Sequence, residues 1–502
     1  MELSQWVSIG LYFIAMLCIG VFAYRTSTDD VSGYLLGGRK VSPHVTALSA
    51  GASDMSGWML MGLPGAMFLV GFETVYIAVG LLIGALANYY LVAPKLRVYT
   101  EVAGDSLTLP EFFANRFGGD KQLVRIVSAV IIVMFFTLYT SAGLVAGGKL
   151  FESAFNVDYH IGLLVTLGVV VGYTLLGGFL AVSMTDFVQG CIMFIALVLV
   201  PVVAFQAFDS VSEMNSFATT SIPTMGEGLT NLTWLGLISA LAWGLGYFGQ
   251  PHIIVRFMAI RSIKDIATAR NIGMSWMLVT IIGALGTGLV GIAYANKFDL
   301  AVNDAETIFI IFSEILFHPL ISGFLLAAIL AAIMSTISSQ LLVSASSLTE
   351  DLYRVFSASK KTEGTEDNQS VLIGRIGVVG VALVAALLAF DRSNTILGIV
   401  SNAWAGFGAA FGPLVLCSLY KANLTHRAAI AGIITGAATV LFWIYVPVLG
   451  DGQTLSSLVY EIVPGFIVSF ITIFGVSALD SSPSEQVQEE FEKTHQLVTQ
   501  HS

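Results

Sequence analysis

Apolar residues recur along the chain in runs of about 20, each ended by glycine, proline or charged residues. A run of that length crosses the ~30 Å hydrocarbon core of a bilayer as one α-helix. The pattern therefore predicts an all-α integral membrane protein with about 13 transmembrane helices. The predicted spans are 5–24, 44–70, 73–94, 126–150, 158–178, 184–206, 232–254, 272–295, 319–346, 371–390, 396–418, 428–448 and 455–478. A further apolar stretch, 305–318, predicts a shorter helix in an outer loop.

The positions of the basic residues give the direction of these helices. With thirteen crossings, all of the 22 Lys and Arg residues except Lys149, Lys297 and Arg392 belong to loops on one side or to the tail on that side. Lys and Arg concentrate on the cytoplasmic side of membrane proteins. The N-terminus is therefore expected outside and the C-terminus in the cytoplasm. Adding or removing one span would scramble this partition, which supports the count.

Composition agrees with a membrane protein and disfavours other classes. Apolar residues make up 56% of the chain and charged residues 11%, far below the roughly 25% of a soluble domain. Membrane lipids are therefore expected around much of the surface. A net charge of −11 without a basic patch argues against nucleic acid as a partner. We expect a single transmembrane domain over 1–478, with a polar loop at 355–370, and an acidic cytoplasmic tail over 479–502 without an apolar face large enough for a domain.

Two of the predicted spans, 44–70 and 232–254, are interrupted by glycine and proline at matching positions. They lie five spans apart and run in opposite directions, which predicts two inverted repeats over about 44–206 and 232–418. Broken helices at matching positions of inverted repeats are typical of secondary transporters, because unwound backbone offers carbonyls to a cation and amides to a carboxylate. The alternative is that small residues only allow close helix packing.

Asp54 lies inside the first interrupted span. A carboxylate at mid-membrane costs on the order of 2.5–3.5 kcal/mol even on the mildest scale, so it needs a partner. No Lys or Arg falls in the central part of any predicted span. The remaining partners are a bound cation, hydroxyls such as those of Ser53 and Ser56, or backbone amides. A structural, hydrogen-bonded aspartate is the alternative.

The span 319–346 offers oxygen atoms of the kind that hard cations bind. Ser335 and Thr336 place two hydroxyls side by side, and the carbonyl of Ala332 lies one turn earlier on the face of Ser335. Hydroxyls in membrane helices more often bond to their own backbone, so this motif is informative mainly together with Asp54. No phosphate-binding loop, nucleophile elbow or Cys/His cluster occurs, and both GxGxxG patterns lie within apolar spans. Neither an enzyme nor a cofactor is therefore expected.

Long motifs in the chain resemble one known family, the sodium/solute symporter family. The resemblance rests on LLGGR (35–39), TALSAGASDMSGWMLMGLPGA (46–66), TLPEFF (108–113), GGFLAVSMTD (177–186), WGLGYFGQPHI (243–253), ILAAIMSTISSQLLVSASSLTEDLY (329–353) and WAGFGAAFGP (404–413). It implies a LeuT-like core of two inverted five-helix repeats, with one extra span before it and two after it. It also implies a multi-pass protein of the bacterial inner membrane that imports a small amino acid with sodium, and we expect L-proline.

The resemblance implies a sodium site and residues that act with it. The expected sodium ligands are the carbonyls of Ala52, Met55 and Ala332 and the hydroxyls of Ser335 and Thr336. Asp54 and Ser56 match positions needed for sodium-dependent transport, either by touching the ion or by organising the broken helix. Arg39 and Asp186 match positions linked to coupling or gating. The alternatives are an ordinary cytoplasmic charge for Arg39 and a helix cap for Asp186.

The resemblance also implies a substrate site, formed by Tyr139, Trp243, Tyr247 and Pro251. An aromatic pocket suits the pyrrolidine ring of proline, and aromatic faces attract its cationic amine. Core packing or a position at the membrane interface is the alternative for each aromatic residue. A symporter of another amino acid or of pantothenate, a proton-coupled transporter and a channel remain alternatives for the whole protein. The sequence leaves the oligomeric state open.

Overall fold

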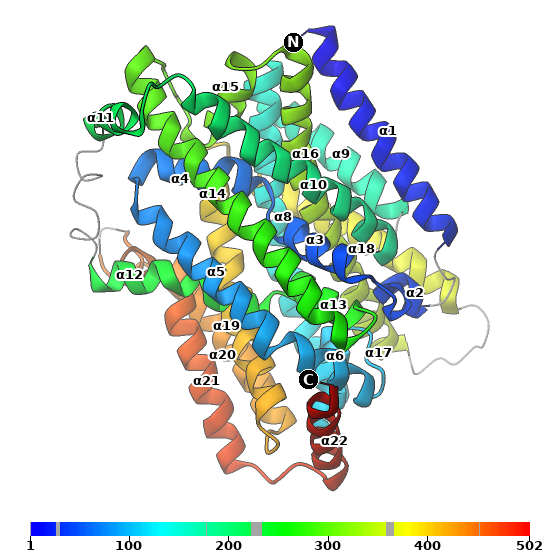
Figure 1. Cartoon of the computed structure of the whole chain (residues 1–502). Coiled ribbons are helices and arrows are strands. Elements are labelled where there is room, and N and C mark those ends of the chain that lie inside the picture. The colour runs from blue at the N-terminus through cyan, green and yellow to red at the C-terminus, as the bar shows by residue number, and fades with distance from the viewer. Residues whose placement is uncertain are drawn as a thin grey trace.

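The computed structural model describes residues 2–26, 31–176, 178–221, 233–357, 366–450 and 452–501. Within these ranges the regular elements are helices, accompanied by one isolated parallel bridge between Val41 and Ile260. Figure 1 shows these helices gathered into one bundle, with the N-terminus at the top of the view and the C-terminal helix at the bottom.

Nine helices of the described chain are long and apolar enough to cross a membrane. They are α1 (Leu3–Thr26), α5 (Glu73–Leu91), α8 (Lys121–Phe155), α10 (Phe179–Phe205), α14 (Ile266–Phe298), α16 (Pro319–Ser346), α19 (Ile396–Tyr420), α20 (His426–Tyr445) and α21 (Ile462–Leu479). Each coincides with one predicted span, although α21 begins seven residues later than the expected position 455.

The other four predicted spans contain shorter apolar helices. Two are single helices, α9 (Tyr159–Leu176) and α18 (Glu366–Leu388). The two interrupted spans are each divided into three pieces: α3 (Pro43–Asp54), η2 (Trp58–Gly62) and α4 (Leu63–Val70), then α12 (Trp234–Leu241), η5 (Ala242–Gly249) and α13 (Pro251–Ala259). Residues 177 and 232, included in the predicted spans, lie outside the described residues.

Shorter helices connect these elements. They are α2 (Val31–Leu36), η1 (Gly37–Arg39), α6 (Ala93–Val102), α7 (Leu109–Phe117), α11 (Val211–Ser221), η6 (Ile263–Asp265), η7 (Ala305–Thr307), α15 (Ile308–Ile315), η8 (Ser347–Tyr353), α17 (Arg354–Ser357), η9 (Leu455–Ser457) and α22 (Glu485–His501). The pair η7 and α15 confirms the helix predicted over 305–318. Of the predicted polar loop, residues 358–365 lie outside the described residues.

Local chemistry sets where the helices begin and break. Ser42 accepts a backbone N–H at the start of α3, and Thr395 does the same for α19, which satisfies an otherwise unpaired donor of the first turn. At the first break, Met55 leaves the helical region with φ −83° and ψ 77°. At the second, Gln250 is extended, with φ −81° and ψ 107°. Pro251 explains this second break, because a proline disfavours the α conformation of the residue before it.

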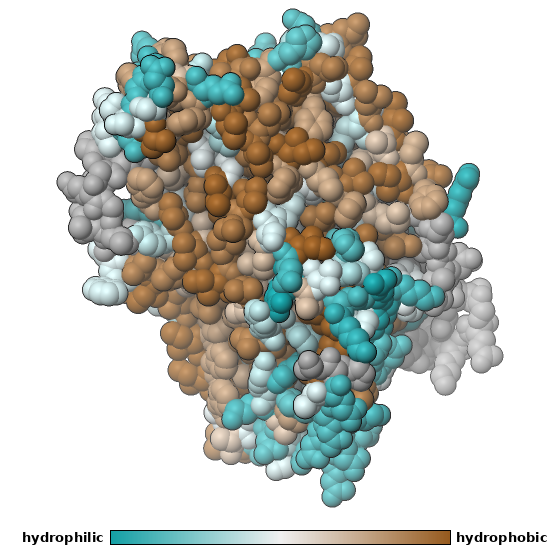
Figure 2. Space-filling view, viewed as in Figure 1, coloured by the Kyte–Doolittle hydropathy of each residue, from teal (hydrophilic) through white to brown (hydrophobic). Residues whose placement is uncertain are grey.

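The surface of the bundle is that of a protein surrounded by lipid. Large apolar side chains on α1, α5, α18 and α21, namely Leu11, Ile83, Leu387 and Ile471, are 61–71% exposed. Figure 2 shows hydrophobic side chains covering the middle of one face, while hydrophilic ones gather over α22 and around α11. Apolar surface this extensive is rare on soluble monomers and fits the hydrocarbon region of a membrane.

The acidic tail forms a helix that packs on the bundle, a feature that the sequence analysis did not predict. Phe491 of α22 lies 6.2 Å from Tyr99 of α6, measured between ring centroids, and 5.2 Å from the guanidinium carbon of Arg116. Lys95 of α6 donates a hydrogen bond of 3.3 Å to the ring of His495 when that ring nitrogen is unprotonated. The α22 helix is therefore held by aromatic and polar contacts to α6 and α7.

Candidate functional site

The first helix break brings several predicted sodium ligands together. Because α3 ends at Asp54, the carbonyl of Ala52 has no partner further along the helix. It accepts instead from the hydroxyls of Ser335, at 2.7 Å, and Thr336, at 3.3 Å. Ser335 also lies 3.1 Å from the carbonyl of Ala332. Two hydroxyls and two carbonyls from α3 and α16 thus converge at one buried point.

Met55 and Ser56 lie at the break itself. The thioether of Met55 is 3.7 Å from the hydroxyl of Thr280 on α14. The backbone N–H of Ser56 donates to the carbonyl of Asp54 at 3.0 Å, and its hydroxyl accepts from the N–H of Trp58 at 3.4 Å. Ser56 therefore organises the unwound segment between α3 and η2.

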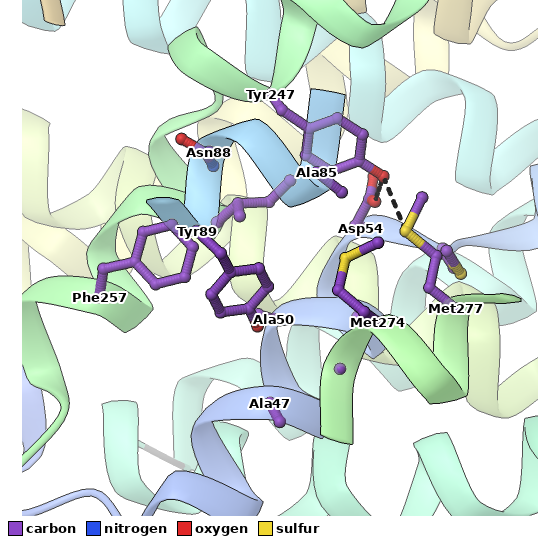
Figure 3. A pocket seen from close by; sticks show the side chains of 14 residues that line it. Ala47, Ala50, Asp54, Ala85, Asn88, Tyr89, Tyr247, Phe257, Met274 and Met277 are labelled. Atoms are coloured by element: carbon purple, nitrogen blue, oxygen red, sulfur yellow. Dashed lines mark hydrogen bonds between the residues drawn. The ribbon is translucent and has the colours of Figure 1, made fainter. Parts of the chain in front are cut away.

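Asp54 connects the two broken helices. Its side chain is buried, and its Oδ2 accepts a hydrogen bond of 2.5 Å from the hydroxyl of Tyr247 on η5 (Figure 3). Its Oδ1 has no hydrogen-bond partner among the described residues. A hydroxyl was among the expected partners, but it comes from Tyr247 and not from the two named serines, because Ser53 donates to the carbonyl of Ala50 and Ser56 accepts from the N–H of Trp58. Sequence reasoning missed Tyr247 as a partner because the contact spans nearly 200 residues.

The four residues predicted to bind substrate are only partly brought together. The hydroxyl of Tyr139 is 3.4 Å from the carbonyl of Asp54, on the same segment that Tyr247 contacts. Trp243 lies one turn earlier, at the start of η5, and stacks on Tyr460, with 5.2 Å between the ring centroids. Pro251 begins α13 and faces a separate cavity lined also by α7 and α16. Tyr139 and Tyr247 therefore share the site around Asp54, and the other two lie beside it.

A small cavity opens next to Asp54 and Tyr247. Its walls come from α3, α5, α13 and α14, and most of its lining atoms are apolar. Figure 3 shows Tyr89, Phe257 and Met274 around it, with the Asp54–Tyr247 contact at one side. A largely apolar lining with a few polar groups is typical of small-molecule sites, but at about 30 Å³ this cavity is a water-sized space.

Asp186 belongs to a buried cluster with a residue that the sequence analysis assigned to a loop. Arg256 is 1% exposed and donates to Asp186 Oδ2 at 3.1 Å, to Ser339 Oγ at 2.6 Å and to Ser49 Oγ at 3.1 Å. Ser49 donates to the same carboxylate oxygen at 2.8 Å. The interpretation of Arg256 as a loop charge is therefore wrong. Its place inside the apolar run HIIVRFMAI was the available signal.

Arg39 makes contacts that an ordinary loop charge would lack. It is buried in the segment before α3, where it donates to the carbonyls of Met258, at 2.8 Å, and Ser106, at 2.8 Å. It also donates to Thr100, at 3.0 Å, and forms an ion pair of 3.1 Å with Asp105. Arg39 thus ties the start of the first broken helix to the end of the second.

A second buried ion pair lies at the other end of the broken helices. Lys149, interpreted from the sequence as an outer-side charge, is 4% exposed and donates to Glu306 Oε2 at 2.7 Å. The same carboxylate accepts from the backbone N–H groups of Ile396, at 3.0 Å, and Leu397, at 3.2 Å, at the start of α19. Glu306 was not singled out in the sequence, because an acidic residue in a loop between spans gave no signal of burial.

Interrupted helices that meet around a buried carboxylate, inside an all-helical bundle with an apolar surface, define the class of secondary transporters. The chain belongs to the sodium:solute symporter family, whose model matches residues 34–436. It is therefore a multi-pass membrane transporter and not an enzyme, and the coupling ion of the family is sodium.

Relatives and solved structures agree with this family. The chain is 56% identical to the osmoregulated proline transporter OpuE of Bacillus subtilis (strain 168), over 97% of this chain and 96% of the relative. It is 50% identical to a sodium/proline symporter of Staphylococcus aureus (strain JH9), over 99% and 96%. The fold resembles that of a Na+-coupled sialic acid symporter in a substrate-bound outward-open state, with a TM-score of 0.76, 18% identity and coverage of 96% and 99%. It also resembles Mhp1, a nucleobase-cation-symport-1 family transporter, with a TM-score of 0.53, 13% identity and coverage of 91% and 98%.

Proposed function

We propose that this protein imports L-proline together with sodium by alternating access. The observation that carries the proposal is the convergence of the Ala52 carbonyl with the hydroxyls of Ser335 and Thr336 at the first helix break. The names of relatives that are 50–56% identical over nearly the full length support proline as the substrate.

The proposed sodium ligands are the carbonyls of Ala52, Met55 and Ala332 and the hydroxyls of Ser335 and Thr336. A hard cation favours such oxygen atoms, and the part of the chain that the structure describes contains no group of three His, Cys, Asp or Glu side chains that would hold a metal instead. On sodium binding, the hydroxyl hydrogens of the two residues turn away from Ala52 so that their oxygens face the ion. Sodium then replaces two hydrogen bonds between α3 and α16 with a stronger electrostatic contact.

The proposed substrate site lies between the two broken helices. Tyr139, Trp243, Tyr247 and Pro251 bind the ring and the amine, and backbone N–H groups at the breaks bind the carboxylate. Asp54 and Ser56 organise the unwound segment after α3, so sodium and proline stabilise the same arrangement of that segment. Each ligand then raises the affinity for the other, which couples the two.

We further propose thirteen crossings with inverted repeats over about 44–206 and 232–418. The nine long helices and the four shorter apolar ones support this count, and the basic residues support an N-terminus outside and a cytoplasmic C-terminus in a bacterial inner membrane. Arg39 and Asp186 then lie toward the cytoplasmic side, where their contacts to α13 restrict opening. The acidic segment 479–502 is cytoplasmic, and its helix α22 packs on the same transmembrane domain.

The gradient supplies enough free energy for this function. A membrane potential of ~100 mV contributes about 2.3 kcal/mol per sodium ion. A tenfold sodium gradient adds about 1.4 kcal/mol. For one sodium per proline, the total of roughly 3.7 kcal/mol sustains about 500-fold accumulation.

The test is uptake of radiolabelled proline into proteoliposomes with and without an inward sodium gradient, at fixed pH and potential. We expect concentrative, sodium-dependent uptake, and Thr336→Ala should raise the sodium concentration for half-maximal uptake about tenfold, since one oxygen ligand is lost. Ser344→Ala is the matched control, because its hydroxyl on the same helix bonds to the Gln340 carbonyl one turn earlier. Uptake driven by a proton gradient alone, or a preference for pantothenate in competition, would replace the proposal with one of the alternatives.

A further inference from the structure

The cavity beside Asp54 is lined by Asn88 of α5, a polar side chain that the proposed contacts do not use. Asn88 is 1% exposed, and neither its amide nitrogen nor its carbonyl oxygen has a hydrogen-bond partner among the described residues. Leaving a buried polar group unpaired costs about 1–3 kcal/mol. Native proteins pair nearly all such groups with protein, water or a ligand, so the partner of Asn88 must come from within the cavity.

The sequence of α5 explains where Asn88 lies. Gly80, Gly84 and Asn88 are four residues apart, so they share one face of the helix. That face packs on the second broken helix: a Cβ added to Gly80 would overlap the carbonyl oxygen of Leu241 at the end of α12, and one added to Gly84 would overlap that of Gly244 on η5. The two glycines bring the backbone of α5 into contact with those of α12 and η5. Asn88 is one turn further along and lines the cavity.

The other groups around the cavity suit a zwitterion with an apolar ring. Asp54 Oδ1 lacks a hydrogen-bond partner within the described chain, and no Lys, Arg or His is among the lining residues. Tyr89, Phe257 and Met274 supply aromatic and thioether walls (Figure 3). The amide of Asn88 can donate to a carboxylate, and Asp54 can accept from an ammonium group. A cation alone would leave the two amide hydrogens unpaired.

We propose that Asn88 binds the carboxylate of the transported amino acid at a second position, on the cytoplasmic side of the main site. The inference rests on the proposed function and names a step on the exit path. The helices α3 and α14 begin, and α5 and α13 end, on the side of the basic loops, so the cavity between them lies in the inward half. At about 30 Å³ the cavity has room for water but not for an amino acid. Substrate therefore reaches Asn88 when α5 and α14 move apart.

The experiment compares wild type with Asn88→Leu in proteoliposomes and in detergent. We expect the KM for proline efflux to rise about tenfold or more, because a hydrogen bond to a charged group is lost. The KM is measured for proline on the inside, in right-side-out vesicles preloaded with it. Sodium binding without proline should stay within twofold of wild type. The melting temperature should stay the same or rise, because leucine removes two unpaired polar atoms from the interior.

Two further variants make the result specific. Thr74→Val removes another buried hydroxyl of α5 that has no hydrogen-bond partner among the described residues and does not line the cavity, and it should keep the wild-type KM. Asn88→Ser retains a donor and should give an intermediate KM, which keeps the test usable if the leucine variant does not fold. An unchanged KM for proline in both Asn88 variants overturns the inference. A loss of sodium affinity, measured without proline, that is as large as the rise in KM also overturns it. If the wild type concentrates no amino acid under a sodium gradient, the proposed function fails as well; if it does and the variants match it, only this inference fails.

Discussion

The hydrogen bond between Tyr247 and Asp54 allows the sharpest test of how the two broken helices work together. Tyr247→Phe removes one hydroxyl and keeps the ring against Trp404, with which it makes an edge contact at 5.0 Å between centroids. Because Asp54 Oδ1 already lacks a partner among the described residues, the variant leaves both carboxylate oxygens unpaired. The end of α3 then loses its tie to η5.

The size of the effect follows from this contact. A hydrogen bond to a charged group contributes about 1.5–3 kcal/mol, and 1.4 kcal/mol corresponds to a tenfold change in an equilibrium constant. If the tie forms in the sodium-binding arrangement of α3 and not in the alternative one, its loss shifts the population away from sodium binding by the same free energy. We expect the sodium concentration for half-maximal proline uptake to rise roughly 10- to 150-fold.

The assay is a sodium titration of proline uptake in proteoliposomes at fixed potential. Tyr99→Phe is the control, because its hydroxyl is also buried and has no hydrogen-bond partner in the described ranges, but lies on α6 away from the site. The control should keep the wild-type sodium dependence. A Tyr247→Phe protein that folds and needs no more sodium than wild type would refute the idea that this contact links the ion site to the second broken helix.

Three further predictions test other contacts. Arg256→Gln should lower the free energy of unfolding by about 3–5 kcal/mol, because it leaves the buried Asp186 carboxylate uncompensated. Adding Asp186→Asn should recover part of this loss. If the losses of the two substitutions simply add in thermal melts, the pairing is contradicted. Glu306→Gln should weaken the contact between η7 and the start of α19. A cysteine introduced at Ala305 in a cysteine-free background should then react faster with an impermeant thiol reagent. An unchanged reaction rate would count against a role of Glu306 in this contact. Burial first, and then nearby positive charges, lower the pKa of His495 below its usual 6.5. The docked α22 thus binds fewer protons than the undocked helix, so its docking should weaken as pH falls from 7 toward 5.5. The protection factors of the α22 amides, which compare each measured exchange rate with the intrinsic rate at the same pH, should therefore fall over this range, and a His495→Asn variant should lose this dependence.

Much of the fold could be predicted because membrane helices follow simple rules. Apolar runs long enough to cross a bilayer gave the positions of the helices, and the glycines and Pro251 gave the two breaks, since a residue before proline avoids the α conformation. The convergence of Ala332, Ser335 and Thr336 was likewise visible, because residues three and four apart share one face of a helix.

The sequence could not reveal contacts that depend on how the helices pack. Arg256 and Lys149 looked like charges at span ends, and their burial follows from Asp186 and Glu306, which lie 70 and 157 residues away in the chain. The docking of α22 was missed for a related reason. Its contacts use Phe491 among charged residues, a signal too weak to distinguish from a solvated helix until Tyr99 and Arg116 are placed against it.

The proposed sodium ligands and the Arg256 cluster join the same two helices, one turn apart. At the break, Ala52 of α3 meets Ser335 of α16. One turn toward the basic side, Ser49 of α3 and Ser339 of α16 both accept from Arg256 of α13. An ion bound between Ala52 and Ser335 fixes the distance between α3 and α16 at that point. It therefore also fixes the distance one turn away, where the Arg256 guanidinium must reach the hydroxyls of both helices. Sodium binding then favours the arrangement in which Arg256 holds the second broken helix, so that its release is expected to accompany opening on that side.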